Sequence, residues 1–175
     1  MRSATKDSPI ESSNDEPVGE IDMASQFPLP HFLKGILSED GYTKWLHGKA
    51  KSHLNRDRKR GNLSETFGSY RRAIHQAVER SCGRDAYTNE ALDWTLVRTY
   101  NNIDSRSGGR AYKAQFSLLP TVDHLDDGSG KPAFEICSWR TNDSKNDLSY
   151  ADFLELCKRV VAANQAAQPD GGAAG

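Results

Sequence analysis

The sequence predicts a small α+β protein, in which a β-hairpin and a short helix are flanked by basic N-terminal helices and a C-terminal amphipathic helix. Two observations lead to this class. Residues 41–60 and 149–163 carry apolar side chains at helical spacing, while residues 121–139 contain two short apolar runs separated by the turn sequence "DDGSGKP". A chain of 175 residues fits one domain of this kind.

The two ends of the chain differ in composition from its middle. Residues 1–27 are predicted to form a disordered acidic segment, because they are rich in Ser, Asp, Glu and Pro and poor in large apolar residues. Residues 164–175 are small and Gly-rich, which predicts a disordered tail. The folded domain is therefore predicted to span residues 28–163.

Cysteine usage and hydropathy indicate a cytoplasmic protein. No apolar run approaches the roughly 20 residues of a membrane helix, and the N-terminus lacks the pattern of a secretory signal. The three cysteines, Cys82, Cys137 and Cys157, are odd in number and far apart, which argues against a disulfide framework. There is no CxxC pair, so no structural zinc is expected.

The net charge of −1 conceals an uneven distribution. Acidic residues dominate the first 25 positions, whereas only Asp57 and Glu65 oppose the cations between Lys44 and Arg72. Such a segment is typical of contacts to nucleic-acid phosphates, although a solvated helix end is equally common. The predicted nucleic-acid-binding residues are Lys49, Arg56, Arg58, Lys59 and Arg60.

The first helix is predicted over residues 41–60, with Tyr42, Leu46, Ala50 and His53 on its apolar face. A second helix should begin after Ser64 and end at Ser81, where Gly83 suits the stop. His53 and His75 are predicted to be core or interfacial residues. Residues 86–104 allow either a short strand or a mixed turn.

The second half of the chain predicts strands followed by helices. "DSRSGGR" has the composition of a loop, and Tyr112 to Leu119 alternates like a strand that leads into "TVDH". "AFEICSW" is the returning strand. Thr141 or Asn142 is predicted to cap a short helix over residues 142–147. Ser149 is predicted to cap the last helix, and Cys137 and Cys157 to lie on buried faces.

Polar residues on either side of the turn predict one site. Asp123 and His124 are adjacent, so on a strand their side chains point to opposite sides. Asn142 and Asn146 are four residues apart and would share one helix face. Carboxylate and amide oxygens suit Mg²⁺ or Mn²⁺, and a histidine is a ready general base. Asn142 could instead be only a helix cap, and Asn146 only a solvent-facing residue.

The pattern resembles the HNH, or His-Me finger, endonucleases. "VDH" resembles the Asp-His form in the HNH domains of CRISPR effector nucleases, and "TNDSKND" is similar to the "CN-x-x-K" segment that starts the helix in many HNH proteins. Four further segments look like bacterial HNH-type proteins of unassigned role over residues 40–162: "YTKWLHGKAKSHLNRDRKRGN", "YTNEALDW", "LPTVDH" and "FEICSWRTNDSKNDLS". The family's zinc-binding cysteine pairs are missing. Its middle Asn would fall near Ala133 or Phe134.

The resemblance implies a ββα-metal core and one-metal hydrolysis of a phosphodiester that leaves 5′ phosphates. By the match, Asp123 and Asn142 are metal ligands, Asn146 is a further ligand and His124 is the general base. Lys145 takes the place of the motif's lysine, and Lys145 or Arg140 is expected to hold a phosphate oxygen. On its own, Lys145 would be an ordinary surface lysine.

The leading expectation is therefore a metal-dependent endonuclease that acts on DNA, with Mg²⁺ or Mn²⁺ as cofactor. One alternative is a binding module that kept the HNH scaffold without turnover. Another is a protein-interaction factor in a larger bacterial complex. Whether such a site is active without the middle Asn is the open point.

Overall fold

The computed structural model describes residues 26–125 and 128–166, and within them the protein is α+β. A single two-stranded antiparallel sheet accompanies five α-helices in this part of the chain. The proposed disordered ends, residues 1–27 and 164–175, fall almost entirely outside it. Residues 26–27 and 164–166 are the exceptions, because the ring of Phe27 is buried against His75 and Arg71 and residues 164–166 are helical rather than part of a disordered tail. The elements in order are η1 (His31–Leu33), α2 (Glu39–Lys59), α3 (Phe67–Ser81), η2 (Trp94–Leu96), α4 (Asn102–Ala114), β1 (Pro120–His124), β2 (Phe134–Ser138), α5 (Trp139–Lys145) and α6 (Tyr150–Ala166).

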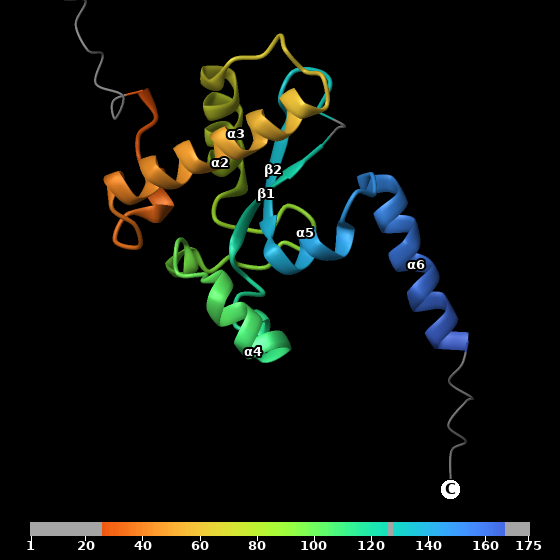
Figure 1. Ribbon diagram of the computed structural model, residues 1–175. Coiled ribbons are helices and arrows are strands. Elements are labelled where there is room, and N and C mark those ends of the chain that lie inside the picture. Colours follow the sequence, from red (N-terminus) through yellow and green to blue (C-terminus); the bar gives the residue numbers. More distant parts are fainter. Residues whose placement is uncertain (1–25, 126–127, 167–175) are drawn as a thin grey trace, which may run out of the picture.

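Helices α2 and α3 form the larger half of the core, and both were predicted. Ser38 caps α2 by accepting a hydrogen bond from the Gly41 amide, and Thr66 forms a capping box with Ser69 at the start of α3. Helix α3 ends at Cys82, whose φ of 46° is left-handed. Figure 1 shows α2 crossing α3 beside the hairpin, whose Phe134 ring packs on the rings of both helices.

The hairpin pairs β1 and β2 in antiparallel register, with Asp123 opposite Glu135 and His124 opposite Phe134. Val122 and Ile136 are buried in the same core cluster as the apolar faces of α2 and α3. One face of the hairpin thus completes the core. This arrangement fixes where each site residue of β1 points.

The prediction for residues 104–119 was wrong. "DSRSGGR" lies inside α4, and the strand starts only at Pro120. The Asn101 side chain caps α4 by accepting from the Ile103 amide, and Gly109 absorbs a kink with φ of 53°. Tyr112 and Phe116, four residues apart, pack on each other as helical neighbours do. The contact between Tyr112 and Phe116 therefore favours a helix over the strand that the partly alternating apolar residues indicated.

Helix α5 begins earlier than predicted. Ser138, the last residue of β2, is its N-cap and accepts a hydrogen bond of 3.1 Å from the Thr141 amide. Neither Thr141 nor Asn142 caps the helix, because both lie within it. Asn142 is thus not needed as a cap. The strand passes directly into the helix, which places α5 at the end of the hairpin.

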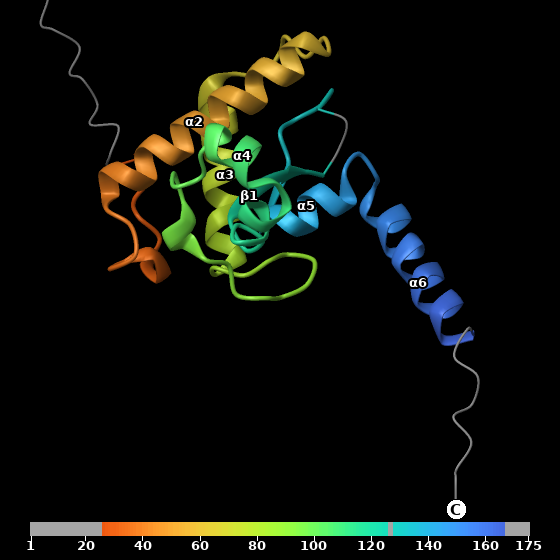
Figure 2. The same ribbon diagram turned by 60° about the horizontal axis from the view of Figure 1, so that its bottom comes forward.

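Helix α6 was predicted correctly, including its cap, because the Ser149 hydroxyl accepts a hydrogen bond from the Asp152 amide. It extends away from the rest of the molecule, as Figures 1 and 2 both show. Its side chains from Tyr150 to Gln165 are exposed apart from half-buried Phe153. The expectation that Cys157 is buried was therefore wrong, whereas Cys137 is buried as predicted. None of the described helices is long and apolar enough to cross a bilayer.

Candidate active site

A cleft of about 740 Å³ lies where the end of β1 meets the C-terminal end of α2 and the loop after α5. It brings together residues that are far apart in the sequence, since α2, β1 and α5 each contribute. The predicted site residues that line it are Asp123, His124, Asn142, Lys145 and Asn146, with Arg56 and Arg60 from the basic segment. These residues carry both hydrogen-bonding and charged groups, as a catalytic cleft requires.

His124 pairs with a carboxylate that lies within the basic segment. Its Nε2 atom is 2.8 Å from Oδ2 of Asp57, and the Tyr70 hydroxyl donates to the same oxygen at 2.6 Å. Asp57 is completely buried on the inner face of α2. A buried carboxylate needs such partners, because an unpaired one would cost several kcal/mol. The pair holds the imidazole ring in one orientation.

The opposite ring nitrogen of His124 faces Arg56. The guanidinium contacts Nδ1 of His124 and also lies 2.9 Å from Nδ1 of His53. Arginine only donates hydrogen bonds, so both Nδ1 atoms are acceptors and the proton of His124 is assigned to Nε2. Burial, followed by the positive charge of Arg56, lowers the pKa of His53 to about 3. His53 is therefore neutral, as an acceptor must be.

Asp123 reaches different neighbours, as expected for residues adjacent on a strand. Its carboxylate accepts a hydrogen bond from the Tyr87 hydroxyl and lies 3.1 Å from the Lys145 ammonium. Burial and the hydrogen bond to Asp123 raise the pKa of Tyr87, so this hydroxyl remains a donor. Asp123 and Lys145 are 5% and 4% exposed, so the carboxylate and its cation are both held out of water.

Asp85 supports both Tyr87 and α5. Its carboxylate accepts hydrogen bonds from the Tyr87 and Ser138 amides, each at 2.8 Å, and from the Thr141 hydroxyl at 2.7 Å. Burial would raise the pKa of Asp85, but these hydrogen bonds outweigh it and lower the pKa. Through Asp85, the loop that carries Tyr87 is fixed to the start of α5.

The hairpin loop is tied down from another part of the chain. The Asn62 side chain, in the α2–α3 connection, donates to the carbonyls of Gly128 at 2.8 Å and Gly130 at 3.0 Å. Gly128 has φ of 80°, and a Cβ there would lie 2.6 Å from Asp57 Oδ1. Ala133 and Phe134 cannot make such bonds. The Asn62 side chain therefore fixes the hairpin loop through a tertiary contact, which the side chains of Ala133 and Phe134 cannot do.

The oxygen donors of the cleft match a hard divalent ion. Asp123, Asn142 and Asn146 supply carboxylate and amide oxygens, and Asp123 already holds one positive charge, that of Lys145. The described part of the chain contains no group of three or more His, Cys, Asp or Glu placed to bind a metal. Asn146 follows α5 as its C-cap with φ of 52°, so it shares the cleft with Asn142 but not a helix face.

Several predicted residues lie outside this group. Arg140 is on the exposed side of α5, where it forms an ion pair of 2.5 Å with Glu90. Arg58 and Lys59 are exposed at the C-terminal end of α2, on other faces of the helix. Lys49 lines a neighbouring cleft, which is also lined by Thr121 of β1. Of the five predicted nucleic-acid-binding residues, Arg56 and Arg60 line the cleft that holds His124.

Sequence reasoning missed Asp57, Asn62, Tyr87 and Asp85. A signal existed for Asp57, because it continues the spacing of Leu46, Ala50 and His53 along the apolar face of α2. A carboxylate on that face predicts a buried partner. The other three lie in connections between elements, where no periodicity indicates which way a side chain points.

No protein-family model, curated protein or solved structure matches this chain. The chemistry of the cleft therefore rests on its own residues. It contains an oriented histidine with an acceptor nitrogen, a set of hard oxygen donors and cations able to bind phosphate.

Proposed function

We propose that this protein is a metal-dependent endonuclease that hydrolyses phosphodiester bonds in DNA, and that β1, β2 and α5 are its HNH-like ββα core. The observation that carries the proposal is the pairing of His124 Nε2 with Asp57 at 2.8 Å in a cleft that also holds Asp123 and Asn142. The pairing leaves Nδ1 as the basic nitrogen.

His124 acts as the general base in this proposal. Nδ1 takes a proton from water, the resulting hydroxide forms a bond to phosphorus, the P–O3′ bond breaks, and the 3′ oxygen takes a proton from solvent. Asp57 keeps the imidazole in the required tautomer and stabilises the imidazolium that forms. Arg56, which covers Nδ1, must first move, and an incoming phosphate offers its guanidinium a bidentate partner.

Asp123 and Asn142 would hold the divalent ion, with Asn146 as a further donor. A bound Mg²⁺ or Mn²⁺ would supply positive charge opposite the phosphate and the leaving 3′ oxygen. Lys145 would then release Asp123 and be available to a phosphate oxygen, which is the role expected from the motif. Arg60 adds a cation at the rim of the same cleft.

Nicking of supercoiled plasmid with Mg²⁺ or Mn²⁺ tests the proposal. His124→Ala should lower the rate by roughly 100-fold or more, because the base is lost. His31→Ala is the matched control, since His31 is exposed in η1 and lies outside the cleft. Equal nicking by wild type and His124→Ala would rule out His124 as the base.

A nucleic-acid-binding module without turnover is the second candidate. The observation in its favour is the buried Lys145–Asp123 pair, which neutralises the carboxylate without an ion. This candidate predicts salt-sensitive DNA binding, no cleavage, and no effect of His124→Ala on affinity. A protein with no DNA affinity at low salt would contradict both candidates and leave a role in protein interaction.

A further inference from the structure

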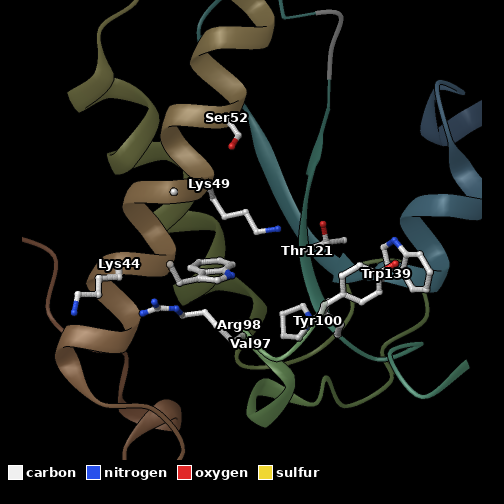
Figure 3. A pocket seen from close by; sticks show the side chains of 12 residues that line it. Lys44, Lys49, Ser52, Val97, Arg98, Tyr100, Thr121 and Trp139 are labelled. Atoms are coloured by element: carbon white, nitrogen blue, oxygen red, sulfur yellow. The ribbon is translucent and has the colours of Figure 1, made fainter. Parts of the chain in front are cut away.

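A second cleft of about 690 Å³ lies beside the active-site cleft, between α2, β1 and the segment that follows η2 (Figure 3). Lys44, Lys49 and Ser52 of α2 line one side, and Thr121 of β1 faces them. Figure 3 shows Lys49 pointing from α2 into the space in front of Thr121. Tyr100 and Trp139 lie together at the far side of the same space.

The lining combines aromatic rings with cations. Tyr100 and Trp139 are half-buried, with ring centroids 5.8 Å apart, so each keeps an accessible part. Trp45 contributes a buried indole beneath the Lys49 side chain, whose ammonium lies 6.0 Å from the ring centre. Stacking surfaces next to cations are the usual means of binding an unpaired base and its phosphate.

Lys49 is a cation whose environment favours an incoming anion. Burial lowers the pKa of Lys49. Within residues 26–125 and 128–166, no carboxylate forms an ion pair with Lys49, whereas Lys44, another cation of the lining, is paired with Asp40. A phosphate group in front of Lys49 would supply the missing counter-charge.

Gly48 keeps this cleft open. It lies in the middle of α2, where glycine costs about 1 kcal/mol relative to alanine. A Cβ at Gly48 would have no atom within 4 Å, so packing does not require glycine there. Gly48 lines the cleft, and a larger side chain would project into it.

A row of α2 residues at four-residue spacing runs from one cleft to the other. Lys44, Gly48 and Ser52 line the second cleft, and Arg56 and Arg60, at the same four-residue spacing, line the active-site cleft. From Lys44 to Arg60 this row rises about 24 Å and winds about 160° around the helix, because each four-residue step advances about 40° beyond a full turn. That length matches roughly seven nucleotides of a stacked strand at 3.4 Å each.

We infer that the substrate is single-stranded nucleic acid, and that the second cleft takes an unpaired nucleotide next to the bond that is cut. The base lies against Tyr100 and Trp139, and its phosphate lies against Lys49. A paired base cannot enter, because its faces and edges are covered by the duplex. This inference rests on the proposed function, because it assigns both clefts to one strand.

The test measures binding without cleavage, by fluorescence anisotropy of the full chain in EDTA at low salt. The probes are a labelled oligothymidylate of roughly 12 nucleotides and a duplex of equal length. Wild type should bind the single strand at least about tenfold more tightly. Gly48→Leu should weaken single-strand binding about tenfold while the helix gains stability, and Lys49→Gln should weaken it about fivefold.

Two controls accompany these variants. Gly48→Ala adds only a methyl group and should change the affinity less than about twofold, because of the open space around this position. Lys158→Gln removes an exposed cation of α6 and should have no effect. Thymidine monophosphate serves as competitor, and it should bind at least about 100-fold more weakly than the strand.

Three outcomes would overturn the inference: duplex bound as tightly as single strand, no change in Gly48→Leu, or the mononucleotide bound as tightly as the strand. The proposed function fails separately. Single-strand binding that depends on Gly48 and Lys49, without metal-dependent cleavage, removes the nuclease and keeps the inference. Cleavage that requires His124 but is unaffected by Gly48→Leu keeps the proposed nuclease and removes the inference about the second cleft.

Discussion

At the residue scale, Asp57 determines the chemistry of His124. It lies between Arg56 and Arg58 in the sequence, yet its side chain is fully buried while both arginines are exposed. Its Oδ2 accepts a hydrogen bond from the Tyr70 hydroxyl and lies 2.8 Å from Nε2 of His124. The carboxylate therefore selects which nitrogen of His124 carries the proton.

Asp57→Asn tests this selection. The amide group can donate to Nε2, which would move the ring proton to Nδ1 and remove the base. Cleavage should fall by on the order of 100-fold to 10⁴-fold. The ¹⁵N chemical shifts of the His124 ring should report the exchange of tautomers even if no substrate is cleaved. Asp40→Asn, an exposed carboxylate on the same helix, should leave rate and shifts unchanged. Unchanged shifts in Asp57→Asn would contradict the assignment.

His53 should make stability depend on pH. Its pKa is about 3 in the folded state, against an ordinary value of 6.5. Between these values the unfolded chain binds a proton that the folded chain does not. The free energy of unfolding should therefore fall as the pH drops below 6.5, by up to about 1.4 kcal/mol per pH unit. Urea denaturation between about pH 7 and pH 5 measures the slope.

His53→Gln removes this titration and should give a shallower slope. His75, whose pKa burial also lowers, contributes equally in both proteins. His31→Gln changes an exposed histidine and should keep the wild-type slope. Equal slopes in wild type and His53→Gln would show that folding does not lower the pKa of His53.

At the scale of the elements, the hairpin depends on a residue outside it. Asn62 makes two hydrogen bonds to the loop between β1 and β2, and its side chain is buried. Asn62→Ala should lower the free energy of unfolding by about 2 kcal/mol, because both carbonyls lose a partner. Amide hydrogen exchange should quicken in β1 and β2 more than in α3.

Asn55→Ala is the matched control, because Asn55 is exposed on α2 and the structure gives its side chain no hydrogen bond. It should alter the free energy of unfolding by less than about 0.5 kcal/mol. If Asn62→Ala leaves exchange in the hairpin unchanged, the loop is held by other contacts.

The helices whose apolar residues recur at helical spacing could be predicted from the sequence. Helix α2 repeats Tyr42, Leu46 and Ala50 on one face, and α6 combines a capping serine with a regular apolar stripe. Residues 104–110 were mistaken for a loop because glycine and serine count against a helix, and the segment from Tyr112 was mistaken for a strand, whereas the packing of Tyr112 on Phe116 and Tyr100 favours a helix. The sequence could not predict whether α6 packs against the rest of the protein, because an apolar stripe shows which face a helix could bury but not whether another element covers it.

The candidate site was predictable where it is local in sequence. Asp123, His124, Asn142 and Lys145 lie in one strand–turn–strand–helix segment, and the structure brings them to one cleft. Tyr87 and Asn62 come from distant loops, so only the tertiary fold shows that they contact β1 or the hairpin loop. Arg140 was grouped with the site by sequence proximity, but the helix turns its side chain toward Glu90.

At the scale of the whole molecule, positive and negative side chains occupy different places in the structure. The net charge is −1, yet α2 presents a row of cations to both clefts while its carboxylate Asp57 faces inward. Local charge therefore governs the response to a polyanion, and the net charge does not. In the proposed nuclease, the same helix would orient His124 through its buried Asp57 and contribute exposed side chains to both clefts.

The Lys145–Asp123 pair has a consequence for how this protein folds. Many small metal-binding folds hold together only once the ion has arrived, because their ligands repel one another without it. Here the chain brings its own positive charge to the buried carboxylate. A divalent ion that binds Asp123 as proposed would therefore have to compete with the Lys145 ammonium group for the carboxylate.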